Sequence, residues 1–220
     1  MPNRRKLAAY TLPMLLFVAL LGLKSIDHWP WLSLGDYWIY PTQTILCGGL
    51  LLWFRREYDF HRLTQPVLVV LIALVVFLLW ISPQAFFGFE ARAAGFNPDT
   101  FSASPALYWT AVALRFARLV VVVPFMEEIF WRGFLLRFLV DEDFERIPFG
   151  SFSWFPFVAV TLAFSFSHSK ADWLAAFITG DIYNGVAYRT KSLSSCVLTH
   201  AVTNLLLGLW IMEAKQWGFW

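Results

Sequence analysis

Hydrophobic stretches long enough to cross a lipid bilayer follow one another along this chain of 220 residues. A helical span needs about 20 mainly apolar residues, and fewer suffice for a helix buried among others. Single spans are predicted at residues 7–26, 37–54, 66–81, 152–167, 173–188 and 193–212. Residues 106–140 are too long for one crossing, and Pro124 removes a backbone donor in their middle, which predicts two helices broken there. The pattern predicts an all-α polytopic membrane protein of about eight transmembrane helices.

The composition agrees with a membrane protein. Hydrophobic residues make up 59% of the chain and charged residues 15%, against about 25% charged residues in ordinary soluble domains. Aromatic residues reach 19%, as expected where rings settle at the level of the lipid headgroups. The formal net charge of +2 is too small for a nucleic-acid-binding surface. Membrane lipid is therefore the expected surrounding, and a nucleic-acid partner is excluded.

Basic residues indicate how these helices are oriented. They precede the first span and follow the second, as Arg4, Arg5, Lys6, Arg55, Arg56 and Arg62. Because cytoplasmic loops carry an excess of lysine and arginine, the N-terminus and the second loop are predicted to be cytoplasmic. An even number of spans would return the C-terminus to the same side. Arg189 and Lys191 would then lie on the opposite side, against the rule.

Polar side chains at membrane depth are confined to the second half of the chain. They are Arg115, Arg118, Glu127, Glu128, Arg132, Arg137, His168, Asp181, Asn184, His200 and Asn204. A charge within a span costs about 2.5–3.5 kcal/mol on insertion scales, so each of these charges needs a partner, a watery cavity or a function. We therefore predict one membrane domain over residues 1–220, in which 1–104 are scaffold and 105–212 carry the chemistry.

Two adjacent acids follow Pro124. Glu128 and Arg132 are four residues apart, with the acid on the N-terminal side, which favours an ion pair within one helical turn. Glu127 points about 100° away around the same helix and has no local cation. It needs a partner from elsewhere. Alternatively, both acids lie at the start of a helix and complement its dipole.

Two histidines and an amide complete the candidate set. His168 ends an apolar stretch, while His200 and Asn204 lie one turn apart on one helix face. Each could be a structural residue that hydrogen-bonds between membrane helices. Together with Glu127 they provide a carboxylate, two imidazoles and an amide, which suffice to activate water and to stabilise an oxyanion.

These residues form three motifs in a fixed order. The motifs are Glu-Glu-x-x-x-Arg at Glu127, Glu128 and Arg132, Phe-x-x-x-His at Phe164 and His168, and His-x-x-x-Asn at His200 and Asn204. They resemble the CPBP family, which includes the type II CAAX prenyl endopeptidases (CAAX prenyl protease 2) and is also called the Abi family in bacteria. The likeness covers residues 120–207. In length and in the sequences of its motifs, the chain also resembles a bacterial branch related to CAAX prenyl proteases and associated with exosortase systems.

The resemblance implies an intramembrane endopeptidase, a hydrolase in the bacterial inner membrane, built around a cavity within the bilayer. Carried over by position, Glu127 is the general base and His168 helps it to hold the attacking water. His200 and Asn204 form the oxyanion hole, and Glu128 and Arg132 are supporting residues. The implied partner is a membrane-associated protein or peptide substrate. Its identity and any lipid it carries stay open, and no cofactor is expected.

Two alternatives remain at this point. In a zinc-dependent protease, Glu127, His168 and His200 would supply three mixed ligands, although no His-Glu-x-x-His motif is present. In a non-catalytic membrane protein of the bacteriocin-immunity or transport type, Asp181 and Asn184 would have a role for which the family resemblance offers no counterpart. Transporters usually show repeated halves, whereas the polar groups here lie in one half only.

Overall fold

The computed structural model describes residues 3–23 and 35–220, and every regular element within these ranges is a helix. The prediction of an all-α fold is confirmed. The helices that match single predicted spans are α1 (Arg4–Gly22), α2 (Gly35–Trp53), α3 (Pro66–Phe86), α7 (Trp154–Phe166), α8 (Trp173–Thr190) and α9 (Leu193–Ala214). Their bounds agree with the predicted ones to within five residues, except that the predicted end of the first span, residue 26, lies outside the described residues.

One long helix replaces the two that were predicted around Pro124. The segments α4 (Pro105–Phe116), η4 (Ala117–Val122), α5 (Val123–Glu128), η5 (Ile129–Leu135) and α6 (Leu136–Phe138) follow one another without interruption. The prediction of a break was wrong because η4 is a π-helical turn directly before Pro124, which places the proline in the first turn of α5. A proline ring is tolerated in a first turn, and the wider π turn accommodates the change in hydrogen bonding.

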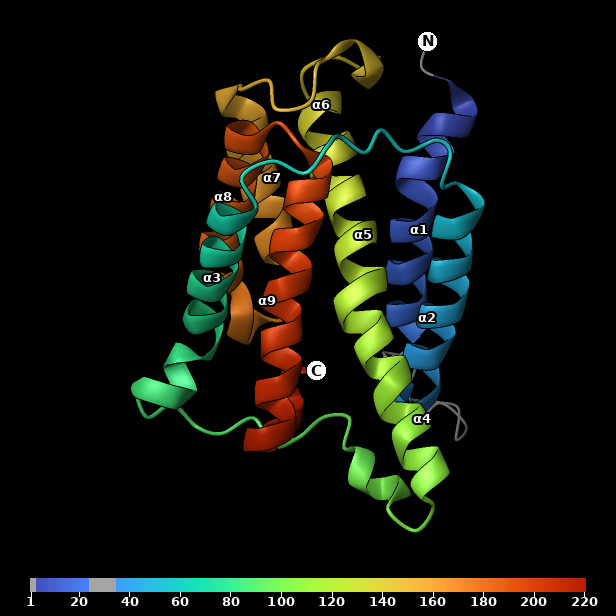
Figure 1. The fold of residues 1–220 in the computed structure, drawn as a ribbon, viewed down its shortest axis with the longest axis vertical. Coiled ribbons are helices and arrows are strands. Elements are labelled where there is room, and N and C mark those ends of the chain that lie inside the picture. The colour runs from blue at the N-terminus through green and yellow to red at the C-terminus, as the bar shows by residue number, and fades with distance from the viewer. Residues whose placement is uncertain (1–2, 24–34) are drawn as a thin grey trace.

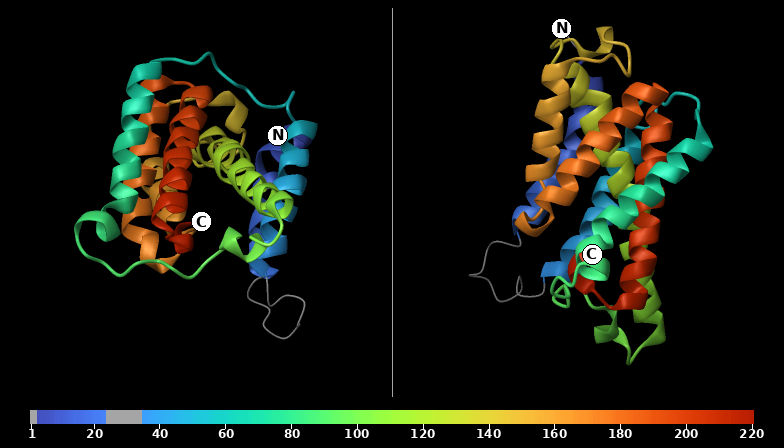
Figure 2. Two further views of the ribbon diagram at one scale, coloured as in Figure 1. Left: turned by 60° about the horizontal axis from the view of Figure 1, so that its bottom comes forward. Right: turned by 90° about the vertical axis from the view of Figure 1, so that its left-hand side faces the viewer.

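The continuous helix Pro105–Phe138 has 34 residues and crosses the centre of the bundle obliquely (Figure 1). At about 1.5 Å per residue it exceeds the bilayer core of about 30 Å, so it must tilt or extend beyond the core. On one side of it α1 packs against α2, and on the other α3 packs against α9 and α7 against α8 (Figure 2). The helix therefore divides the bundle into two groups.

The two ends of the bundle differ in charge. The chain starts at the upper end of Figure 1, and α9 ends at the lower end, so the predicted return of the C-terminus to the N-terminal side was wrong. Thr64 donates to the carbonyl of Thr190 over 3.0 Å and Ser192 to that of Arg62 over 2.9 Å, which fixes the α8–α9 turn beside the loop that follows α2. Arg189, next to this turn, consequently lies at the same end of the bundle as the basic residues that precede α1 and follow α2. The conflict with the positive-inside rule therefore disappears.

In the part of the chain that the structure describes, four helices are long and apolar enough to cross a membrane, namely Arg4–Gly22, Pro66–Phe86, Pro105–Phe138 and Leu193–Ala214. Large apolar side chains are exposed on their outer faces, such as Val67 of α3 at 72% and Leu15 of α1 at 58%. Apolar side chains turned outward are expected where the surrounding solvent is lipid. The chain is therefore an integral membrane protein, and the total of about eight spans stays a prediction.

Candidate active site

A cavity of about 340 Å³ lies at the centre of the bundle, and all four predicted catalytic side chains line it. Glu127 comes from the long helix, His168 from the end of α7, and His200 and Asn204 from α9. The fold therefore brings together residues that are up to 77 positions apart in the sequence, from Glu127 to Asn204. Exposed residues such as Val18, Ser167 and Ser169 also line the cavity, which opens at the end where α7 is followed by α8.

Glu127 is a buried acid with an unused oxygen. It is 9% exposed, and its Oε2 atom has no hydrogen-bond partner among the described residues. A buried carboxylate normally finds a donor, so an oxygen without one at a cavity wall marks a position for water or substrate. Arg118 lines the same cavity and donates from Nε to Oε1 of Gln43 over 2.8 Å, which brings a cation to the site that the sequence motifs had not included.

His168 is held in one tautomer by the helix that it follows. Its Nδ1 atom lies 2.8 Å from the carbonyl oxygen of Phe164. A carbonyl only accepts, so Nδ1 carries the hydrogen, and in the neutral ring Nε2 has the free electron pair. The ring also contacts Trp80 and Phe164, with centroid distances of 5.6 and 4.7 Å. The imidazole is thus oriented before any substrate is present.

Glu128 is at the centre of a buried polar network. Its Oε1 atom accepts from Nη1 of Arg132 over 3.1 Å, so the ion pair expected from the four-residue spacing is present. The same oxygen accepts from Nδ1 of His200 over 2.8 Å, a contact that no local spacing could reveal. Both Glu128 and Arg132 have fully buried side chains. The acid therefore links the long helix directly to the histidine of α9.

Asn184 explains why Arg132 can be buried. It accepts from Nε of Arg132 over 3.1 Å, while its own amide donates to Oγ1 of Thr161 over 3.0 Å. Arg132 also donates from Nη2 to the carbonyl of Gly180 over 3.4 Å. A Cβ at Gly180 would lie 3.1 Å from the ring of Phe164, so the glycine permits this close approach of α7 and α8. The family resemblance offered no role for Asn184, and its hydrogen bonds here are those of a structural residue.

Asn204 donates a hydrogen bond to a backbone carbonyl that has no donor within its own helix because of Pro124. The N–H of Val123 binds the carbonyl of Arg118 in the π-helical register, and Pro124 has no N–H. Neither Val123 nor Pro124 can therefore donate to the carbonyl of Leu119. Nδ2 of Asn204 donates to this carbonyl instead, over 2.8 Å. An amide nitrogen carries two hydrogens, so one remains after this bond is made. The contact positions the amide of α9 against the long helix.

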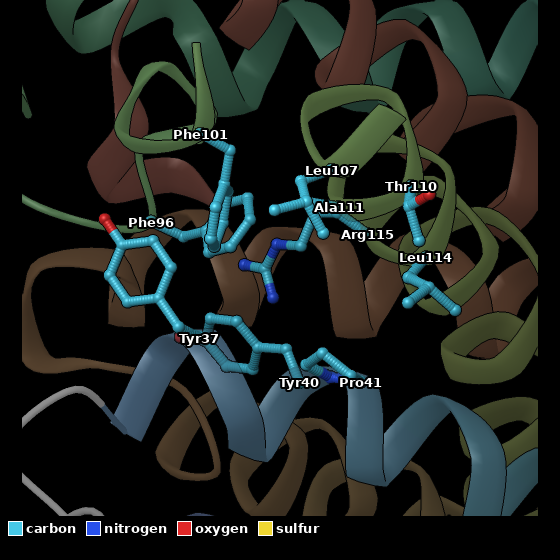
Figure 3. A pocket seen from close by; sticks show the side chains of 10 residues that line it. All are labelled: Tyr37, Tyr40, Pro41, Phe96, Phe101, Leu107, Thr110, Ala111, Leu114 and Arg115. Carbon is cyan, nitrogen blue, oxygen red and sulfur yellow. The ribbon is translucent and has the colours of Figure 1, made fainter. Parts of the chain in front are cut away.

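A second, smaller pocket of about 160 Å³ lies between α2 and α4 (Figure 3). The guanidinium group of Arg115 lies 3.7 Å from the ring centroid of Tyr40, and Phe96 flanks it. The lining is otherwise mainly aromatic and aliphatic and includes no acid and no histidine. This pocket therefore offers no partner for acid–base chemistry, in contrast to the central cavity.

No group of three histidine, cysteine, aspartate or glutamate side chains within residues 3–23 and 35–220 is arranged so that it could hold a metal ion. Glu127, His168 and His200 line one cavity but are not gathered into the compact set that zinc requires. Cys47 and Cys196 are both buried as free thiols and do not contribute to the site.

Comparison with known protein families gives a match over part of the chain. Residues 108–206 match the family model described as type II CAAX prenyl endopeptidase Rce1-like. Over these 99 of the 220 residues the chain is similar to that family. The match includes all seven residues of the three motifs, and the family described is one of endopeptidases, which are hydrolases of protein substrates. No curated protein and no solved structure matches the chain, and the exosortase-associated branch stays a prediction.

Proposed function

We propose that this chain is an intramembrane endopeptidase of the CPBP family, in which Glu127 activates a water molecule to hydrolyse a peptide bond of a membrane-associated substrate. The observation that carries the proposal is the convergence of Glu127, His168, His200 and Asn204 on one cavity, with Oε2 of Glu127 unpartnered among the described residues. A carboxylate, an imidazole and further donors around one space are the groups that general-base hydrolysis requires.

The hydrogen bonds suggest how the water would be held. Glu127 presents an oxygen without a donor in the described part of the chain, and neutral His168 presents Nε2 as an acceptor because Nδ1 is bonded to a carbonyl. A water molecule has two hydrogens, and it would donate one to each acceptor. Its electron pair would then be free to attack the substrate carbonyl, and the released proton would pass to Glu127. As the oxyanion collapses and the peptide C–N bond breaks, Glu127 would give this proton to the leaving nitrogen.

The other two residues would stabilise the oxyanion that forms. Nδ1 of His200 donates to Glu128, and Nε2 would donate to the oxyanion in the doubly protonated ring. Asn204 has one amide hydrogen left after its bond to Leu119. Two such donors aimed at one oxygen form an oxyanion hole.

We expect the hydrolysis to be independent of metal, because each polar side chain already has a separate task. Purified protein in proteoliposomes would be incubated with a quenched peptide ending in a prenylated CAAX sequence, with a matched unprenylated peptide, and with a total membrane protein extract. New amino termini should form at the same rate before and after prolonged treatment with a strong chelator. Zinc whose removal stops cleavage and whose return restores it would contradict the metal-free mechanism, and no new termini from any probe would contradict the protease.

We further propose that the N-terminal end of the bundle is cytoplasmic, so that the cavity opens to the opposite side of a bacterial inner membrane. The segments at the N-terminal end are the start of α1, the loop after α2, the connection from α6 to α7 and the α8–α9 turn. They contain Arg4, Arg5, Lys6, Arg55, Arg56, Arg62, Arg146, Arg189 and Lys191. The segments toward the other end contain Arg92 after α3, Lys170 between α7 and α8, and Lys215 after α9, and Lys24 is outside the described residues. This asymmetry is typical of cytoplasmic loops. Substrates would then be proteins already exported across the membrane.

A labelling experiment tests this orientation. Lys170 and Arg56 are exposed at opposite ends of the bundle, whereas the native Cys47 and Cys196 are buried. In intact cells that express Lys170→Cys, a membrane-impermeant maleimide should label the protein. Arg56→Cys should be labelled only after the cells are lysed. The reverse pattern would contradict the orientation without affecting the proposed hydrolysis.

A further inference from the structure

The outer face of α8 carries an acid at mid-helix. Asp181 is exposed, and it forms no hydrogen bond or ion pair with any residue that the structure describes. Leu174 and Phe177 share this face and are 74% and 42% exposed. In the right-hand view of Figure 2, α8 crosses the front of the molecule between α7 and α3. Asp181 is therefore turned away from the rest of the bundle.

The sequence predicts residues 173–188 to be a membrane span, and Asp181 lies near the middle of the corresponding helix α8. The helix has 18 residues from Trp173 to Thr190, and Asp181 is near its centre, about 12 Å from either end. The adjacent helices α3 and α7 contain no charged residue at all. Acids within spans are rare, and they almost always face a protein partner or a watery cavity rather than lipid.

A glycine on the same face has no explanation within the chain. Gly185 lies one turn beyond Asp181, is exposed, and would place a Cβ in open space. A glycine inside a helix weakens it relative to alanine, so its presence needs a reason. Gly180 has one, because Phe164 lies against it, but Gly185 does not. In membrane helices, small residues allow the backbone of another helix to approach closely.

We propose that this face, defined by Leu174, Phe177, Asp181 and Gly185, binds a transmembrane helix of another protein that carries a lysine or arginine within its apolar stretch. The cation would neutralise Asp181, and Gly185 would let the two helices approach. A second copy of this chain fits poorly, because a two-fold pairing of α8 helices would place one Asp181 against the other. The face is independent of the proposed hydrolysis, since Tyr183, two residues on, lines the cavity on the opposite side of the helix.

Energy transfer in lipid vesicles tests the proposal. Donor-labelled protein would be mixed with an acceptor-labelled synthetic helix of leucine and alanine that has one central lysine, or a central leucine in the matched control. The lysine helix should associate roughly fivefold to tenfold more strongly, as expected for one hydrogen-bonded pair in a membrane. Asp181→Leu, the milder Asp181→Asn, and Gly185→Ile should each abolish most of this preference.

The matched control variant is Gly49→Ile, because Gly49 of α2 also has open space where a Cβ would lie but has no acid one turn away. It should keep the preference for the lysine helix. Equal association of the two helices with the native protein would overturn the proposal. The proposal would equally fail if Asp181→Asn retained the preference, or if Asp181 promoted transfer between copies of the protein itself.

Discussion

Replacing Glu127 by glutamine is expected to lower the rate of peptide hydrolysis by about 10² to 10⁴, the usual contribution of a positioned general base. Glutamine has nearly the same shape but cannot accept the proton of the attacking water. Because Oε2 of Glu127 has no partner among the described residues, the substitution should break no hydrogen bond of that oxygen. Initial rates in proteoliposomes, together with thermal unfolding of the purified variant, would measure both effects.

Glu90→Gln provides the matched control, because Glu90 is exposed in the loop after α3 and does not line the cavity. It should hydrolyse substrate at the native rate. If Glu127→Gln also retained native activity, another group would have to be the base. The proposal that Glu127 activates water would then be wrong.

Replacing Glu128 by glutamine should instead destabilise the protein, by about 3–5 kcal/mol in the free energy of unfolding. The change leaves the guanidinium of Arg132 buried without its counter-ion and removes the carboxylate beside His200. Asn184 and Gly180 offer Arg132 only neutral acceptors. Denaturation in mixed micelles would measure the loss, and the fraction of monodisperse protein would report whether the variant folds at all.

Two further variants separate the loss of stability in Glu128→Gln from a general effect of removing charge. Glu128→Gln combined with Arg132→Met should be less destabilised than the sum of the single changes, since no unpaired charge remains buried. Asp143→Asn removes an exposed ion pair to Arg146 and should cost about 0–1 kcal/mol. Strictly additive losses in the double variant would contradict a buried ion pair that depends on both partners.

The sequence sufficed for the fold class and for most helices because hydrophobic runs of spanning length depend only on the lipid around them. The exception was Pro124, where a local rule predicted a break. The rule failed because the π-helical turn η4 shifts the backbone pairing, and Asn204, 85 residues beyond Leu119, takes over the carbonyl left without a donor. Compensation of this kind comes from tertiary structure and leaves no local signal.

In the candidate site, too, contacts within one helix could be predicted and contacts between helices could not. The spacing of Glu128 and Arg132 predicts their ion pair, because both lie on one helix. The bond from His200 to Glu128 and the bond from Arg132 to Asn184 join separate helices, so neither could be predicted from periodicity. A polar side chain within a span was the only available sign that Asn184 has a partner.

The position of the buried ion pair within one helix has a consequence for biosynthesis. Glu128 and Arg132 can neutralise each other as soon as their own helix has been made, whereas Asn184 follows Arg132 by 52 residues and His200 follows Glu128 by 72. The most highly charged helix can therefore enter the lipid before its later partners leave the ribosome. If Glu128 and Arg132 lay on separate helices, the one made first would remain in the bilayer as an unpaired charge until the other had been translated.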